Sequence, residues 1–287
     1  MPELACLNGR IMPISEAKIP VEDRGLQFGD SVYEVIRAYS GHLWLLDRHM
    51  ERLRTSLEAL DFVGVDLSEV EAQIKAVLQR SGISDAIVYL QITRGVAPRM
   101  HAIPRNITPN IIITVRHVQP IPEELYVTGV KAVLVEETRW ARRDIKATNL
   151  LPNILAYNEA RKRGAFEAIF VDQADGMVTE GSHTNVFAVI NGVLRTPPTD
   201  HRILPGVTRE FVLELAAREG INVDVSPLPV SELNEAEEIF LTGTLTEILG
   251  VTLLENRMVG TGTVGTITKR LHSAFREEIR KAIESAA

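Results

Sequence analysis

The spacing of apolar residues along the first half of the chain predicts two amphipathic helices. In the segment 47–60, leucine and methionine recur every three or four positions, which is the spacing of one helix face. A second helix is predicted over 67–80, with Asp66 or Ser68 as its cap. The apolar segment 43–46 before the first helix predicts a short strand.

Two β-rich segments follow these helices. In 86–94, Val88, Leu90 and Ile92 alternate with more polar residues, which is typical of a strand with one buried face. The segment 110–118 is rich in isoleucine, valine and threonine. We expect the two strands to be antiparallel neighbours.

A proline-rich segment, Gln119–Glu124, separates the two halves of the chain. Two prolines in four residues are incompatible with a central strand or a helix interior. We therefore predict a smaller N-terminal domain over 1–118, a linker over 119–125 and a larger C-terminal domain over 126–287.

The C-terminal half also mixes strands with helices, without the regular spacing of parallel β–α–β units. The pattern predicts strands over 130–136, 167–171, 176–179, 184–190 and 238–241, a hairpin turn at Asn191-Gly192, and helices over 150–163, 208–219 and 263–285. We predict an α+β fold in each domain.

Composition narrows the class of protein. The chain has 287 residues, of which 45% are hydrophobic, and its net charge of −7 argues against a nucleic-acid or anionic membrane partner. The first ten residues do not resemble a secretion signal, and no apolar run approaches the roughly 18 residues of a membrane-spanning helix. With Cys6 as the single cysteine, we expect a soluble protein of the reducing cytoplasm.

Lys146 follows a cluster of arginines, Arg139, Arg142 and Arg143, between a predicted strand and a predicted helix. Positive charge nearby favours the neutral amine that Schiff-base chemistry requires. The alternative is a basic loop that is merely solvated, because runs of charge usually face solvent.

Glu180 precedes a Gly-Ser pair and a β-branched segment, which predicts a carboxylate on a turn at the mouth of a sheet. An acid beside a pyridine nitrogen keeps that nitrogen protonated. The alternative is a turn acid, with Ser182 or Thr184 capping a local backbone group.

Two segments could hold a phosphate, which needs backbone N–H groups at a helix start and a fixed cation. They are 204–208, which opens a predicted helix, and 242–247, which follows a strand. Ordinary helix capping is the alternative for both. Arg52, off the apolar stripe of its helix, could supply the cation, or it could simply face solvent.

In combination, these segments resemble the fold-type IV pyridoxal-phosphate enzymes, and above all the D-amino-acid aminotransferases, with branched-chain aminotransferases as more distant relatives. The resemblance covers nearly the whole chain. Its blocks are EDRGLQFGDSVYE (22–34), RGVAPRMH (94–101), RDIK (143–146), TEGS (179–182), LPGVT (204–208) and TGT (242–244).

The resemblance implies a two-domain homodimer with pyridoxal 5'-phosphate in the cleft between the domains, and with active sites that border the subunit interface. Lys146 would form the Schiff base and act as the proton shuttle, and Glu180 would pair with the pyridine nitrogen. The residues implied for the phosphate are Arg52, Val207, Thr208 and Thr244.

The resemblance also implies the substrate site. Arg99 and His101 lie two residues apart, on one side of an extended segment, and with Tyr33 they match the carboxylate-binding residues of D-amino-acid aminotransferases. The wall that receives the carboxylate selects the enantiomer, so these residues favour a D-amino acid such as D-alanine or D-glutamate, with a 2-oxo acid as acceptor. Their alternative is an exposed polar loop. His183 and Gly243 depart from the best-known D-specific members, which have small hydroxyl residues there.

Other activities of the same fold remain open: a branched-chain L-amino-acid aminotransferase, an (R)-selective amine transaminase and an aminodeoxychorismate lyase. A catalytically silent cofactor-binding protein is the alternative outside the enzymes, although such a protein has no need of a proton shuttle at Lys146. We expect no metal site.

Overall fold

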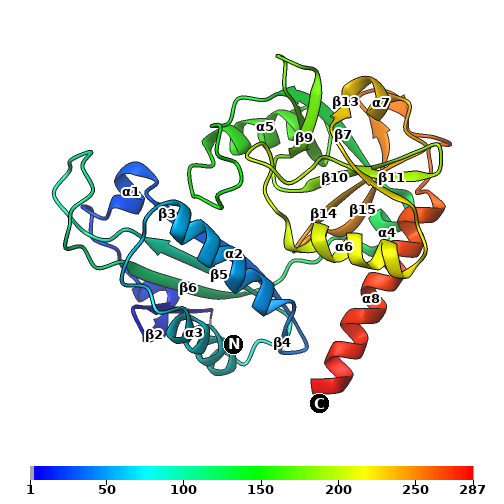
Figure 1. The fold of residues 1–287 in the computed structure, drawn as a ribbon. Coiled ribbons are helices and arrows are strands. Elements are labelled where there is room, and N and C mark those ends of the chain that lie inside the picture. Colours follow the sequence, from blue (N-terminus) through cyan, green and yellow to red (C-terminus); the bar gives the residue numbers. More distant parts are fainter. Residues whose placement is uncertain (1–2, 287) are drawn as a thin grey trace. The chain divides into compact units, whose positions relative to one another are not determined.

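The computed structural model describes residues 3–286, which form two compact units (Figure 1). The first unit contains the chain up to Gln119, the short segment Ile145–Asn149 and the residues from Ala282 on. The second unit contains Pro120–Asp144 and Leu150–Lys281. Both units combine helices with a sheet, which confirms the α+β prediction.

The first unit is built on a six-stranded antiparallel sheet in the order β2-β1-β6-β5-β3-β4. Its strands are β1 (Leu4–Leu7), β2 (Arg10–Pro13), β3 (Ser31–Tyr39), β4 (His42–Leu43), β5 (Ala86–Thr93) and β6 (Asn110–His117). The helices are the 3-10 turn η1 (Ile14–Glu16), α1 (Arg24–Phe28), α2 (Leu46–Ala59) and α3 (Leu67–Ser81).

The apolar residues that alternate along β5 lie on the face of the sheet that α2 and α3 cover. Val88, Leu90 and Ile92 are fully buried in one core with apolar residues of α2 and α3, and the two helices lie over the sheet in Figure 1. The predictions of both helices and of antiparallel pairing between β5 and β6 are confirmed. The Asp66 side chain accepts from two backbone N–H groups of α3 and so caps it.

One local prediction was wrong. The predicted strand 43–46 is instead the end of β4 and the start of α2. In the predicted linker, α4 begins at Glu123 with Pro122 as its N-cap, so neither proline lies inside the helix. Proline suits the start of a helix, where its missing N–H is not needed.

The second unit contains a ten-stranded mixed sheet in the order β12-β11-β10-β14-β15-β7-β8-β9-β13, with β16 paired to β15. Its strands are β7 (Val130–Glu136), β8 (Glu167–Val171), β9 (Met177–Gly181), β10 (Asn185–Ile190), β11 (Val193–Thr196), β12 (Val223–Val225), β13 (Leu228–Pro229), β14 (Glu238–Gly243), β15 (Glu247–Leu254) and β16 (Arg257–Met258). The helices are α4 (Glu123–Thr128), α5 (Leu151–Lys162), α6 (Val207–Arg218), α7 (Val230–Asn234) and α8 (Thr266–Ala286).

The central strands of the second sheet are rich in apolar residues and mostly buried, which is typical of strands covered on both faces. All five residues of β8 are buried, and Phe170 packs in one core with Ala156 and Ala160 of α5. Phe187 of β10 stacks on Phe240 of β14, with ring centroids 4.9 Å apart. Among residues 3–286, no helix combines the length and apolar character needed to cross a membrane.

Candidate active site

Lys146 lies at the edge of the first sheet, whereas we expected it in the C-terminal domain. Its backbone oxygen accepts from the N–H of Tyr33 at 3.0 Å, and Ala147 forms a β-bridge with Val32. The Lys146 N–H donates to Oγ of Ser56 in α2 at 3.2 Å. Because β4 pairs only with the far end of β3, the other end of that edge is open to this segment. Hydrogen bonds to Tyr33 and Ser56, which are far from Lys146 in the sequence, therefore place Lys146 beside β3.

Tyr33 brings a side chain to Lys146 on the sheet face opposite α2 and α3. Side chains alternate along a strand, and Glu34, the next residue, lies on the helix-covered face. The Lys146 Nζ lies 4.3 Å from the centroid of the Tyr33 ring. The structure thus brings together two of the predicted site residues.

Arg52 is buried, with 8% of its surface exposed, so it does not face solvent. Its Nε and Nη2 donate to the two carboxylate oxygens of Glu34, each at 2.7 Å, and His49 Nδ1 lies 2.7 Å from the same carboxylate. Burial alone would raise the pKa of Glu34, but the Arg52 charge and the hydrogen bonds lower that pKa to about 2. Burial lowers the pKa of His49. Glu34 therefore fixes the orientation of the Arg52 guanidinium.

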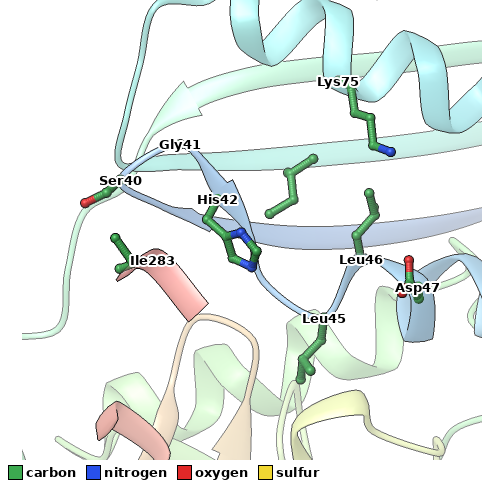
Figure 2. A pocket seen from close by; sticks show the side chains of 9 residues that line it. Ser40, Gly41, His42, Leu45, Leu46, Asp47, Lys75 and Ile283 are labelled. Atoms are coloured by element: carbon green, nitrogen blue, oxygen red, sulfur yellow. The ribbon is translucent and has the colours of Figure 1, made fainter. Parts of the chain in front are cut away.

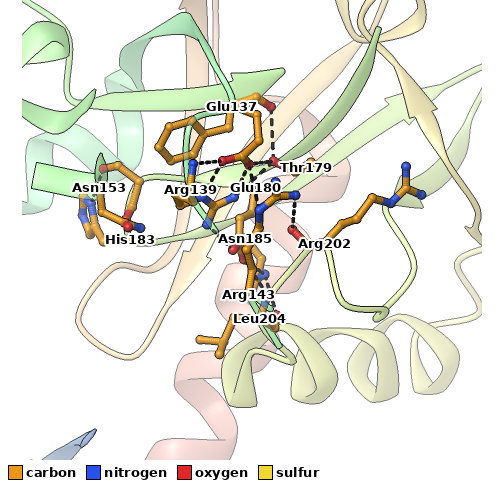
Figure 3. A network of polar contacts seen from close by, with 12 residues as sticks. Glu137, Arg139, Arg143, Asn153, Thr179, Glu180, His183, Asn185, Arg202 and Leu204 are labelled. Atoms are coloured by element: carbon orange, nitrogen blue, oxygen red, sulfur yellow. Dashed lines mark hydrogen bonds and ion pairs between the residues drawn. The ribbon is translucent and has the colours of Figure 1, made fainter. Parts of the chain in front are cut away.

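Glu180 lies within β9 and is buried, whereas we expected it on a turn. One carboxylate oxygen accepts from Arg139 Nη1 at 2.5 Å, and the other accepts from Asn185 Nδ2 and the Leu204 N–H, each at 3.0 Å. Figure 3 shows this network. Burial raises the pKa of Glu180, and Arg139 opposes the rise.

The arginines before Lys146 do not provide the unpaired positive charge that we expected from the sequence. Arg139 pairs with both Glu137 and Glu180, Arg142 pairs with Asp144, and Arg143 lies 3.6 Å from the Glu137 carboxylate. The neighbouring carboxylates therefore neutralise the positive charge of these arginines.

Val207 and Thr208 are the first two residues of α6, and both are buried. The first N–H groups of a helix have no partner within it, and the N-cap, Gly206, has no side chain to cap them. A Cβ at Gly206 would lie 1.9 Å from Oδ1 of Asn185, so this helix start is packed against the Glu180 network.

Thr242 adds a buried hydroxyl to the same region. It is directly opposite Asn185 in the β10–β14 pairing, so both side chains lie on one face of the sheet. Among the described residues, its Oγ1 has no hydrogen-bond partner, although Thr242 is only 1% exposed. Thr244, the residue predicted from the sequence, is half-buried in the turn that follows β14.

Arg99 and His101 lie on an exposed loop with bends and no strand. Both contact Phe28, with the Arg99 guanidinium carbon 4.5 Å and the His101 ring centroid 5.7 Å from the centroid of its ring. Within residues 3–286, no hydrogen bond or ion pair joins either residue to Tyr33. The structure therefore groups Arg99 with His101, and Tyr33 with Lys146.

No role was assigned from the sequence to Asn185 in the second unit or to Glu34 in the first unit. Asn185 is in the same segment as Glu180, and Glu34 follows Tyr33. Thr242 was included only as the first residue of the candidate phosphate segment 242–247. Their partners lie on other strands and helices, so only strand pairing could have indicated them.

A pocket of about 790 Å³ in the first unit contains none of the predicted site residues (Figure 2). It is lined by Ser40, Gly41, His42, Leu43, Leu45, Leu46, Asp47, Lys75 and Ile283. Within the described part of the chain, no cluster of three or more metal-ligating side chains was found.

Comparison with known proteins establishes the family. Residues 31–254 match the model of the class IV aminotransferases. The chain is 40% identical over 276 residues to a D-alanine aminotransferase of Bacillus licheniformis, with 95% of each chain covered. It is similar to the branched-chain amino acid aminotransferase of Escherichia coli (TM-score 0.91, 30% identity, 96% and 94% covered). It is also similar to a branched-chain amino acid aminotransferase of T.th. with pyridoxamine 5'-phosphate (TM-score 0.87, 29% identity, 96% and 93% covered).

The chain belongs to the class IV aminotransferases. It is therefore a transaminase that depends on pyridoxal 5'-phosphate, and the resemblance drawn from its sequence blocks is confirmed.

Proposed function

We propose that this enzyme transfers the amino group of a D-amino acid to a 2-oxo acid, with Lys146 as the residue that holds the cofactor. The observation that carries the proposal is the 40% identity, over 95% of both chains, to a protein named D-alanine aminotransferase. Matching names among relatives from Listeria and Staphylococcus, at 35–39% identity, support it.

The residues of the second unit fit the cofactor. A buried carboxylate such as Glu180 can hold a proton on a pyridine nitrogen, and Arg139 helps to keep that carboxylate ionised. The α6 N-terminus offers N–H groups of Val207 and Thr208 to a phosphate. The Thr242 hydroxyl, which has no partner in the described part of the chain, and the adjacent turn with Thr244 provide further donors in the same unit. We assign the phosphate to these groups and to Arg52.

When bound, the cofactor withdraws electrons from the substrate α-carbon and makes its proton acidic. Lys146 would hold the cofactor through its side-chain amine. The Nζ of Lys146 would also act as the base that takes the substrate α-proton and as the acid that returns it in the second half of the transfer. The Tyr33 ring, 4.3 Å from Nζ, limits the positions that this amine can take.

Tyr33, Arg99 and His101 are proposed to bind the substrate α-carboxylate. A guanidinium offers two parallel N–H donors to a carboxylate, and Arg99 is exposed and available for such a contact. Because the α-proton must point towards Lys146, the wall that receives the carboxylate selects the D enantiomer.

We further propose that the enzyme is a homodimer of the cytoplasm with active sites that border the subunit interface. Leu151, Ile154 and Leu155 share one face of α5 and are 66%, 52% and 62% exposed. Contiguous apolar surface of this kind often marks a protein interface. Sedimentation of the wild type and of Leu155→Glu, with Lys162→Glu as the control, tests this: we expect only Leu155→Glu to shift the dimer towards monomer.

The main competing activity is branched-chain L-amino-acid transamination, which the structural neighbours favour. Half-reactions decide between the activities. The holoenzyme is mixed separately with D-alanine, L-leucine and (R)-1-phenylethylamine, and conversion to the pyridoxamine form is followed by absorbance. We expect D-alanine to convert the enzyme fastest. Faster conversion by L-leucine or by the amine would overturn the proposed substrate class, and pyruvate release from aminodeoxychorismate without an added 2-oxo acid would indicate the lyase.

A further inference from the structure

Arg24 of α1 is a buried arginine to which the proposed reaction assigns no role. It is 4% exposed. Its Nε donates to Oδ2 of Asp30 at 2.8 Å, and its Nη1 donates to the backbone oxygen of Met100 at 2.7 Å. Met100 lies between Arg99 and His101, and its oxygen belongs to the peptide group that joins it to His101, so the second hydrogen bond holds the backbone between these two residues.

The loop around Met100 has few other attachments. Residues 98–108 contain no helix or strand. Among residues 3–286, two hydrogen bonds join this loop to the rest of the chain: the one from Arg24, and a longer one of 3.4 Å from Arg99 Nη1 to the oxygen of Gln27. An exposed loop with so few hydrogen bonds would be mobile without the short one.

Phe28 connects Arg24 to the same pair of residues through its ring. The guanidinium carbon of Arg24 lies 4.9 Å from the ring centroid, and that of Arg99 lies 4.5 Å from it. The His101 ring lies 5.7 Å away. Cation–π contacts of this length are attractive, so Phe28 is a common support for the three side chains.

Asp30 fixes the Arg24 side chain and is itself held by a second arginine. Arg94 donates to the same carboxylate from Nε at 3.1 Å and from Nη2 at 3.0 Å. Arg94 is itself fixed to the end of α2, because it donates to the backbone oxygens of Leu60 at 2.7 Å and Asp61 at 3.0 Å. A chain of charge-assisted hydrogen bonds therefore runs from α2 to the Met100 peptide.

We propose that Arg24 is a positioning residue that holds Arg99 and His101 in the arrangement that receives the substrate carboxylate. This inference rests on the proposed function, in which that pair binds the carboxylate. Lysine cannot replace Arg24, because a single ammonium lacks the planar fork that contacts Asp30 and Met100 together.

Arg24→Lys tests the proposal, with Arg105→Lys as the matched control, since Arg105 is an exposed arginine of the same loop. Half-reactions are measured with D-alanine and with D-alaninamide, which lacks the carboxylate. We expect Arg24→Lys to lower the second-order rate constant of the half-reaction with D-alanine on the order of 10-fold. This is the size of a lost charge-assisted hydrogen bond. The D-alaninamide value and the cofactor absorbance should stay within about 2-fold of the wild type.

A second measurement is independent of turnover. Amide hydrogen exchange of the 98–108 peptide should be faster in the Arg24→Lys holoenzyme and unchanged in Arg105→Lys. Unchanged exchange, or an equal loss for both substrates, overturns the positioning role. Failure of the proposed function is seen separately: the wild type would then not react with D-alanine, or Arg99→Ala would react as fast as the wild type.

Discussion

Arg139 and Glu180 form an ion pair in which 6% and 7% of the two side chains are exposed, and the Nη1–Oε1 distance is 2.5 Å. Arg139 also holds Glu137 through Nε and Nη2. Arg139 therefore pairs with two buried carboxylates, and one of them is the acid that we assign to the cofactor ring (Figure 3).

Arg139→Met should shift the acid limb of the pH–rate profile to higher pH. Burial already raises the pKa of Glu180, and Arg139 opposes that rise. Without Arg139, Glu180 takes up its proton at a higher pH, so activity at pH 7 falls and partly recovers as the pH is raised. Breaking a buried ion pair also costs about 3–5 kcal/mol of stability. Arg142, an exposed arginine that pairs with Asp144, provides the control: Arg142→Met should leave the acid limb in place. An unshifted acid limb in Arg139→Met would contradict the role of Arg139.

Lys146→Ala should lower the transamination rate by roughly 10²–10⁴-fold, the usual size of a lost proton-transfer group, or more. Borohydride treatment should add the cofactor mass to the peptide that contains Lys146 in the wild type and not in the variant. Lys75→Ala, at an exposed lysine paired with Glu71, should behave as the wild type in both measurements. Parent-rate turnover by Lys146→Ala would refute the assignment.

Thr242→Val should separate cofactor binding from stability. The wild-type hydroxyl is buried and has no hydrogen-bond partner among residues 3–286, so its removal should leave the melting temperature of the apoenzyme unchanged or raise it. If Thr242 binds the phosphate, the Kd of the cofactor should rise roughly 10-fold or more, the size of a hydrogen bond to a charged group.

Thr196→Val is the opposite case to Thr242→Val. Its hydroxyl is buried and donates to the backbone oxygen of Val186 at 2.8 Å. This variant should lose about 1 kcal/mol of stability and keep the wild-type Kd. An unchanged Kd in Thr242→Val would exclude that hydroxyl from the cofactor site.

Because His183 pairs with Glu167, we expect the free energy of unfolding to depend on pH. Desolvation of the imidazole lowers the pKa of His183, although 47% of its side chain is exposed, but the Glu167 charge and hydrogen bond outweigh this effect, so the pKa is raised. Burial raises the pKa of Glu167, yet His183, Ser182 and Thr184 together lower it. The histidine contribution is complete below its unfolded pKa of about 6.5 and is lost as pH rises through the folded value. The glutamate contribution is complete above about pH 4.3 and is lost as pH falls through its folded value.

Thermal unfolding of the wild type and His183→Asn should therefore differ most between about pH 4.3 and 6.5, and the difference should shrink at higher pH. A difference in melting temperature that is constant from about pH 5 to about pH 9 would show that the imidazolium does not contribute.

Local pattern was sufficient for the elements with strong periodicity. The helices around Leu53 and Val70 and the strand with Leu90 lie within a residue or two of their predicted bounds, because each has a regular apolar face that must be buried. Strand β3, which carries Tyr33, was not predicted as a strand. Buried Glu34 and Arg37 interrupt its apolar pattern, and their partners are on other elements.

The sequence by itself determined the family, the periodic helices and strands, and which lysine and acid to examine, because these depend on residues close together in the chain. Only the tertiary structure decided that the Lys146 segment pairs with β3 and that Glu34 fixes Arg52. It also decided that Glu180 lies within β9 and forms an ion pair with Arg139. Each of these partners is between 18 and more than 100 residues away along the chain. Such pairings arise from strand order and from the need of buried charges for a partner, and no local pattern records them.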